Sequence, residues 1–434
     1  MPKTRRMSDL PQELVGEKIL TKVPITSVKE VRSTCKKWEA ITKSWVVLGK
    51  AAAAAAAAGP HEFLGFMTMN AKVYSLRFHL REEEEEDLVV DVSAKQVDLL
   101  NQLEISKVYH CDGLVLCVAT DHSKLVVWNP YLCQTRLIGP RENFNIRDNY
   151  AIGYSSSSSE RDHKILRFVD DYSAPGPTRV FRCEIYGISS DSWRVLKPKP
   201  EWKIQINEHH RGVSVKGNTY FFAHERFVVI DDFGGRDCEV EDFLLCFDFT
   251  KERFGPRLPL PFHSYNEDCV TLSNVRDDQL AVLFGAFESD SFEIWVTLTV
   301  EPDHVSWSKF LLVEPGPALK FKLNDYFGGS FFVDEENKVA VVFEISDPHQ
   351  HTAFVFGQAG YIQSVNLGQV TKIQYLCPYT TKHLEALLPP LVCSSSYRPS
   401  LMQVKRTPLH KRKRHLLRGK SKFIITIQNC HYLF

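Results

Sequence analysis

The sequence predicts a mainly β protein in which a short N-terminal all-α segment precedes a large β-propeller-like domain of about six blades. Two observations lead to this prediction. Apolar residues in roughly the first 45 positions recur at the three-to-four-residue spacing of amphipathic helices. From about residue 63, short strand-like runs alternate with turns and repeat at intervals of about 50 to 60 residues.

The composition is that of an ordinary globular protein. The 434 residues are 44% hydrophobic and 24% charged, with a formal net charge of zero. There is no run of about 18 apolar residues and no apolar stretch at the N-terminus, so we expect neither a membrane span nor a signal peptide. The 11 cysteines form no CxxC pair, which favours reduced thiols without a metal or other cofactor, in the cytoplasm or nucleus.

The helical segment opens with "SDLPQELVGEKILTKVP", residues 8–24. Pro11 suits the first turn of a helix because the N–H that it lacks would have no partner there, and Pro24 ends the helix. A second helical stretch comes after "SVKE", residues 27–30, which has the form of a capping box. About 40 residues seldom stabilise a core unaided, so we expect another protein to complete the apolar face of this segment.

Two stretches of biased composition flank the strand-rich region. An alanine run with Gly59 and Pro60 after it predicts a helix and its end, and we interpret residues 49–62 as a spacer. Residues 404–422 contain nine Lys or Arg and no acid, so residues 403–434 are interpreted as a basic tail, either a nuclear-import signal or simply solvated. Aromatic residues do not alternate with these basic ones, so nucleic-acid binding is not expected.

The strand-rich region contains an internal repeat. "VVWNPYLCQTRLI" (126–138), "EIYGISSDSWRVL" (184–196) and "LLCFDFTKERFGPRL" (244–258) each predict strand, turn and return strand. In each, an aromatic residue precedes the return strand by seven positions; the pairs are Trp128 and Thr135, Tyr186 and Trp193, and Phe247 and Phe254. With looser copies at Trp295 and Phe356, the spacings are 58, 61, 48 and 61 residues, close to the period of kelch-like propeller blades. Stacked β-sandwich domains are the alternative.

Several local patterns are interpreted as structural. Asp112–Gly113 and Asn129–Pro130 are turn dipeptides, and Ser155–Ser159 is expected in a hairpin loop. "HQH", His349–His351, lacks a nearby third ligand, and we predict a solvated polar turn there. Four cysteines in apolar runs are expected to be buried: Cys111, Cys117, Cys183 and Cys246.

Two family resemblances cover nearly the whole chain. "DLPQELVGEKILTKVPITSVKEVRSTCKKW" (9–38) resembles the F-box, although "LVGEKIL" holds one more residue than the usual form. One extra residue rotates a helix by about 100°. Residues 63–402, with "CDGLVLCV", "LVVWNPYLCQTRLI" and the closing "YRPSLMQV", resemble the plant F-box-associated interaction domain, type 1. The resulting division is F-box 4–48, spacer 49–62, interaction domain 63–402 and tail 403–434.

The resemblance implies a non-catalytic subunit of an SCF-type (cullin–RING) ubiquitin ligase. The F-box would bind the adaptor subunit and, through it, the cullin, while the β domain would bind an unknown target protein for ubiquitination and degradation. The residues expected to form the adaptor-binding module are Leu10, Pro11, Leu14, Ile19, Leu20, Val23, Pro24, Val28, Val31, Cys35 and Trp38.

Two other functions remain open at this stage. A propeller enzyme, an oxidase or a glycan hydrolase, would need His, Tyr or carboxylates gathered near the ends of different blades. The sequence has no GxxxxGK[ST], HExxH, GxSxG or strand-linked GxGxxG motif. An inactive, pseudogene-like F-box protein is the other possibility.

Overall fold

Strands dominate the part of the chain that the structure describes. The computed structural model describes residues 15, 31, 34, 36–42, 62–82, 88–97, 100–144, 147–156, 161–171, 180–197, 211–230, 236–265, 268–316, 319, 321, 323, 330–346, 349–376, 383–393 and 397–404. A helix, α3 (Lys36–Thr42), precedes the strands. The alanine run and the basic tail lie outside the described residues.

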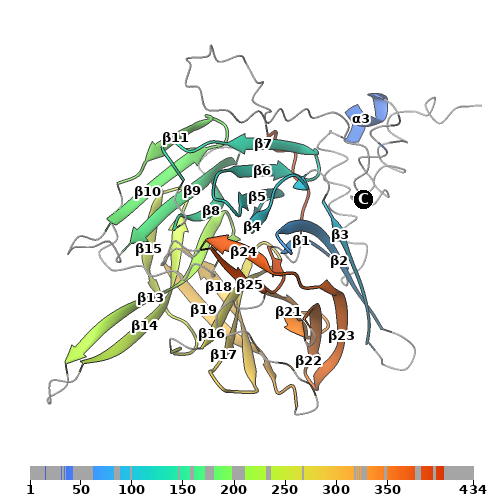
Figure 1. Cartoon of the computed structure of the whole chain (residues 1–434), viewed down its shortest axis with the longest axis vertical. Helices are drawn as coiled ribbons and strands as arrows, with labels where there is room; N and C mark the ends of the chain where they lie inside the picture. The colour runs from blue at the N-terminus through green and yellow to red at the C-terminus, as the bar shows by residue number, and fades with distance from the viewer. Residues whose placement is uncertain are drawn as a thin grey trace, which may run out of the picture.

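Six four-stranded antiparallel sheets succeed one another around a common axis, as the colours of Figure 1 show. Blade 1 is β26 (Leu391–Val392), β1 (Glu62–Met69), β2 (Lys72–Glu82) and β3 (Leu88–Gln96). Blade 2 is β4 (Ile105–Cys111), β5 (Leu114–Ala119), β6 (Leu125–Asn129) and β7 (Gln134–Ile138). Blade 3 is β8 (Asn149–Ser155), β9 (Asp162–Asp171), β10 (Val180–Gly187) and β11 (Ser192–Val195).

The second half of the ring has the same plan. Blade 4 is β12 (Val213–Val215), β13 (Asn218–Ile230), β14 (Arg236–Asp248) and β15 (Arg253–Leu258). Blade 5 is β16 (Cys269–Val275), β17 (Gln279–Gly285), β18 (Phe292–Glu301) and β19 (His304–Val313). Blade 6 is β20 (Ser330–Asp334), β21 (Val339–Ser346), β22 (Gln350–Gly357) and β23 (Gly360–Gln369), and a hairpin of β24 (Ile373–Leu376) and β25 (His383–Ala386) comes after it.

Each neighbouring pair of blades shares a cluster of buried apolar residues, including the pair formed by blades 6 and 1. Phe78 of blade 1 meets Phe332 of blade 6 with ring centroids 5.0 Å apart, in an edge-to-face arrangement. A ring of shared cores is what a propeller requires and what stacked sandwiches lack. The prediction of about six blades is therefore confirmed, and the alternative is wrong.

The repeated aromatic residues mark the third strand of each of blades 2 to 6. Trp128, Tyr186 and Phe247 lie on β6, β10 and β14, and each lies directly opposite its predicted partner on the fourth strand. Trp295 and Phe356 occupy β18 and β22. The seven-residue spacing arises because a short turn returns the chain to the same point on the adjacent strand.

The ring is closed by the C-terminal end of the propeller. β26 is the innermost strand of blade 1 and pairs with β1, with Val392 opposite Met67. Beyond it, the Tyr397 hydroxyl accepts a hydrogen bond from the Tyr131 N–H at 3.1 Å. The Asn129 amide donates to the carbonyls of Ser400 and Met402, both at 2.9 Å. The "YRPSLMQV" segment is thus fastened to blade 2.

The predicted turn at Asp112–Gly113 joins β4 and β5, and both residues have positive φ, 51° and 76°. The four cysteines expected to be buried are buried, with free thiols. The prediction for His351 was wrong. It begins the buried part of β22, is 1% exposed, and its Nε2 lies 3.0 Å from the Asn70 side-chain oxygen. Burial lowers its pKa to about 4, so it is neutral.

Candidate functional site

The described part of the helical segment contains a small apolar cluster. Val15 is fully buried and Ile41 is 8% exposed, with Val31 and Trp38 packed against them. The Thr34 hydroxyl donates to the Val31 carbonyl at 2.7 Å. Two residues of the predicted adaptor-binding module, Val31 and Trp38, therefore lie together. The other nine lie outside the described residues: Leu10, Pro11, Leu14, Ile19, Leu20, Val23, Pro24, Val28 and Cys35.

Val15 was not among the predicted adaptor-binding residues, and it lies in the core of the segment itself. Its backbone is π-helical. The extra residue between Leu14 and Ile19 lies outside the described residues.

In the propeller, Arg211 ties the innermost strands together. It precedes β12 and donates to the Val108 carbonyl of β4 at 3.2 Å, to the Ser330 hydroxyl of β20 at 3.1 Å, and to the Val392 carbonyl of β26 at 2.6 Å. Burial lowers the pKa of its guanidinium. One side chain thus connects blades 1, 2, 4 and 6. Sequence reasoning missed Arg211, because only its place immediately before an innermost strand marks it.

A polar cluster is called the channel mouth: Asp112, Arg161, His163, Asp277 and Arg398. Its acids lie in the turns after the innermost strands β4 and β16, and its basic residues come from the start of β9 and from the C-terminal segment. Asp112, in the turn after β4, pairs with Arg161 and lies 2.9 Å from Nε2 of His163. Asp277, in the turn after β16, pairs with Arg398 at 3.0 Å. Burial raises the pKa of the Asp277 carboxyl, and Arg398 opposes that rise.

The channel mouth is the kind of gathering that a propeller enzyme would need, since its acids come from blades 2 and 5. Each acid, however, faces an arginine from another element. The first pair joins blade 2 to blade 3, and the second joins blade 5 to the C-terminal segment. We therefore assign the channel mouth to holding the propeller together.

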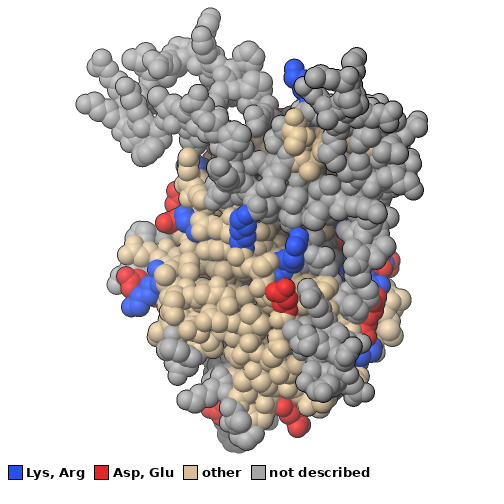
Figure 2. Space-filling model, turned by 90° about the vertical axis from the view of Figure 1, so that its right-hand side faces the viewer, with Lys and Arg blue, Asp and Glu red and all other residues tan. Residues whose placement is uncertain are grey.

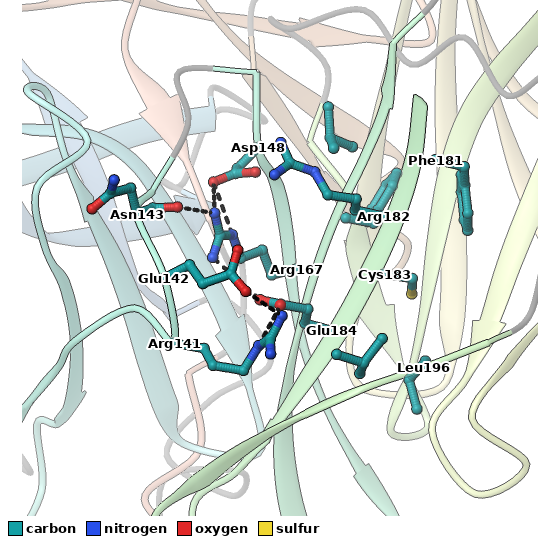
Figure 3. Close-up of a pocket in the computed structure, with 13 residues that line it drawn as sticks. Arg141, Glu142, Asn143, Asp148, Arg167, Phe181, Arg182, Cys183, Glu184 and Leu196 are labelled. Carbon is teal, nitrogen blue, oxygen red and sulfur yellow. Dashed lines mark hydrogen bonds and ion pairs between the residues drawn. The ribbon is translucent and has the colours of Figure 1, made fainter. Parts of the chain in front are cut away.

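A pocket of about 140 Å³ opens beside blade 3 (Figure 3). The buried Arg167 bridges Asp148 at 2.7 Å and Glu184 at 3.2 Å, and donates to the Asn143 carbonyl at 2.6 Å. Arg141 binds the other oxygen of Glu184 at 2.8 Å. These ionic groups face one another in Figure 3 and fasten the β7–β8 connection to blade 3, so their charges are already matched within the chain.

The comparison with protein families agrees with this architecture. A family model described as the F-box associated beta propeller domain matches residues 64–404. The chain belongs to the plant F-box proteins with this domain. Among its relatives, an F-box/kelch-repeat protein of Arabidopsis thaliana is 54% identical over 408 residues, which is 90% of each chain.

Further F-box proteins of Arabidopsis thaliana match over similar lengths. Another F-box/kelch-repeat protein is 48% identical over 94% of this chain and 98% of its own. A protein named only as an F-box protein is 46% identical over 92% of this chain and 99% of its own. Solved structures are more distant: the nidogen/laminin complex is 12% identical at a TM-score of 0.36, covering 77% of this chain and 99% of that one. This likeness adds nothing on function.

Other features of this F-box protein bear on its chemistry. Among the described residues, no group of three or more His, Cys, Asp or Glu is placed to hold a metal ion. In the same residues, no helix has the length and apolar character needed to cross a membrane.

The outer surface of the propeller is uneven in charge. The outermost strands of blades 1 to 5 each contain Lys, Arg or Asp, whereas β23 of blade 6, "GYIQSVNLGQ", contains no charged residue. Figure 2 views the molecule from the side of β2, β3 and β23, and the described surface there is largely uncharged. Tyr361 and Ile362 of β23 are 39% and 36% exposed. Charged residues on an edge strand normally deter pairing with other chains.

Proposed function

We propose that this F-box protein is the substrate-recognition subunit of an SCF-type (cullin–RING) ubiquitin ligase. Its helical segment binds the adaptor subunit, and its propeller binds a target protein that is then ubiquitinated and degraded. The chain itself is non-catalytic. Its contribution is proximity, because two binding surfaces on one chain raise the local concentration of the target near the activated conjugate.

The observation that carries the proposal is the small apolar cluster of Val15, Val31, Trp38 and Ile41 beside a complete propeller. The propeller buries its own apolar surface between its six blades, so it needs no helical cover. A helical segment of about 40 residues seldom stabilises a core on its own. A helical face of this kind is expected to be completed by a partner protein.

The test is adaptor binding by purified full-length protein. The double variant Pro11→Ala, Leu20→Ala is expected to lose the adaptor subunit in a pull-down, because both residues belong to the predicted adaptor-binding module. The matched control is Leu298→Ala, an apolar residue that is 69% exposed on β18 and should leave adaptor binding unchanged. Circular dichroism checks that the propeller remains folded. Undiminished binding by the double variant would refute the assignment.

We also propose that the protein works in the cytoplasm or the nucleus, with the basic tail as a nuclear-import signal. A fluorescent fusion of the full chain should then be enriched in the nucleus relative to a fusion that lacks residues 405–434. Equal distribution of the two fusions would instead mark the tail as a solvated extension.

A further inference from the structure

Two connections at the same end of blades 4 and 5 expose aromatic side chains. Tyr265, in the connection from β15 to β16, is 71% exposed, and Phe287, in the connection from β17 to β18, is 43% exposed. His263 lies beside Tyr265 with its ring centroid 5.1 Å away, and its side chain is 57% exposed. These three residues are called the aromatic patch.

One carboxylate holds both connections in place. Asp268 accepts a hydrogen bond from the Tyr265 N–H at 2.7 Å with one oxygen, and from the Phe287 N–H at 2.8 Å with the other. Asp242 of β14 accepts from the N–H and the hydroxyl of Ser264, at 2.7 and 2.8 Å. These hydrogen bonds fix the backbone beneath the aromatic patch. Less conformational entropy is therefore lost when a partner binds.

The first connection also contacts β17, the strand that leads into the second connection. Phe262 of the first stacks on Phe284 at the end of β17, with ring centroids 4.3 Å apart and planes 13° from parallel. Exposed aromatic side chains on a supported backbone are typical of binding surfaces rather than of solvated loops.

Apart from His263, the charged residues of the two connections are all acidic. Residues 259–268 and 286–291 contain Glu267, Asp268, Glu288 and Asp290 but no Lys or Arg. Glu288 and Asp290 are exposed, in the same turn as Phe287. An acidic rim around aromatic rings is complementary to a cationic partner, whose Lys or Arg can also lie over the rings.

We propose that the aromatic patch is a docking surface for a basic segment of the target protein, in which Lys or Arg residues flank an apolar anchor. This inference rests on the proposed function, since it names the partner chemistry of the propeller. The anchor packs on Tyr265 and Phe287, and the basic residues meet Glu288 and Asp290. The chain's own basic tail carries the same charge and is the competing occupant.

The test selects ligands from a phage-displayed library of random peptides on the purified full-length protein. Enriched peptides are then resynthesised with a fluorescent label and titrated. We expect Lys or Arg around an aromatic or aliphatic residue, and affinity that falls as salt rises. The double variant Tyr265→Ala, Phe287→Ala should bind at least about tenfold more weakly. The control Leu298→Ala should bind like the wild type.

A second variant keeps the test independent of the rings. Glu288→Lys, Asp290→Lys should weaken the basic peptides and leave adaptor binding intact. The proposal is overturned if no basic peptides are enriched or if both double variants bind them like the wild type. It is also overturned if deletion of residues 405–434 raises peptide affinity, because the tail is then the occupant. Failure of the proposed function is distinguishable, since it appears as loss of adaptor binding in the wild-type protein.

Discussion

Replacing Arg211 with methionine should loosen the closure of the propeller. The substitution keeps an unbranched side chain but removes every donor that reaches Val108, Ser330 and Val392. Hydrogen bonds from a charged group contribute about 1.5–3 kcal/mol each, so three bonds set an upper limit of about 9 kcal/mol. Burial disfavours the guanidinium, as its lowered pKa shows, and offsets part of that sum. We expect the free energy of unfolding to fall by about 3 kcal/mol.

The assay is urea unfolding of the full-length protein, monitored by tryptophan fluorescence. Trp128, which is 1% exposed, reports on the interface of blades 1 and 2 next to the closing strand. Hydrogen exchange gives a more local measure. The Val392 N–H, bound to the Ser330 hydroxyl at 2.9 Å, and the Cys393 N–H, bound to the Phe66 carbonyl at 2.8 Å, should exchange faster in the variant.

The control is Arg276→Met. Arg276 pairs with Glu336 at 3.0 Å, but its side chain is 54% exposed, so its removal should cost less than about 1 kcal/mol. The reasoning is refuted if Arg211→Met lies within about 1 kcal/mol of the wild type and the closing-strand amides stay protected. That result would show that the shared cores alone hold the ring closed.

Three further predictions concern the turns, the buried histidines and the helical segment. Gly113→Ala should destabilise the protein by about 3 kcal/mol, because φ is 76° and the added Cβ would meet the Arg398 carbonyl at 2.6 Å. Gly316→Ala, with φ 78° and no such neighbour, should lower the free energy of unfolding by about 1 kcal/mol. Gly139→Ala should leave it unchanged in urea unfolding. Equal losses of stability in all three variants would disprove the steric argument. Burial lowers the pKa of His110 to about 4. Between roughly pH 6.5 and pH 4 the unfolded chain therefore binds a proton that the native chain does not. The free energy of unfolding should fall by about 2 kcal/mol over that range. His110→Gln should reduce that loss in pH-dependent unfolding, and an unchanged pH profile would exclude this histidine as its source. Deleting Gly16 restores the spacing of the usual F-box form, and it should strengthen adaptor binding in a titration because one extra residue rotates a helix by about 100°. An affinity that stays within about threefold of the wild type would mean that the insertion does not misplace the binding face.

The blade repeat of the propeller could be predicted from the sequence because it depends on residues that are close together in the chain. An aromatic residue and its partner seven positions later face each other across a hairpin, so Trp128 and Thr135 could be paired from their spacing alone. The turn at Asp112–Gly113 was equally local, since both residue types tolerate positive φ. The adaptor-binding module was named from its resemblance to the F-box, and most of its residues lie outside the described part of the chain.

Contacts between residues of different blades could not be predicted from the sequence. His351 was predicted to be solvated because its sequence neighbours are polar, but the fold places Asn70 of blade 1 against it. Asp112 was interpreted only as a turn residue, although it also binds Arg161 and His163 of the next blade. Both residues acquire their environment from positions far away in the sequence, and a single sequence contains no record of such contacts.

By itself, the sequence determined the class of fold, the number of blades and the separate helical segment, because strand, turn and helix patterns arise from neighbouring residues. Only the tertiary structure decided which residues close the ring and which aromatic side chains stay exposed. Arg211 reaches three other blades, and Asp268 joins two connections that expose Tyr265 and Phe287. The physical reason is that hydrogen bonds and burial act through space, and the folded chain brings together groups that its sequence keeps far apart.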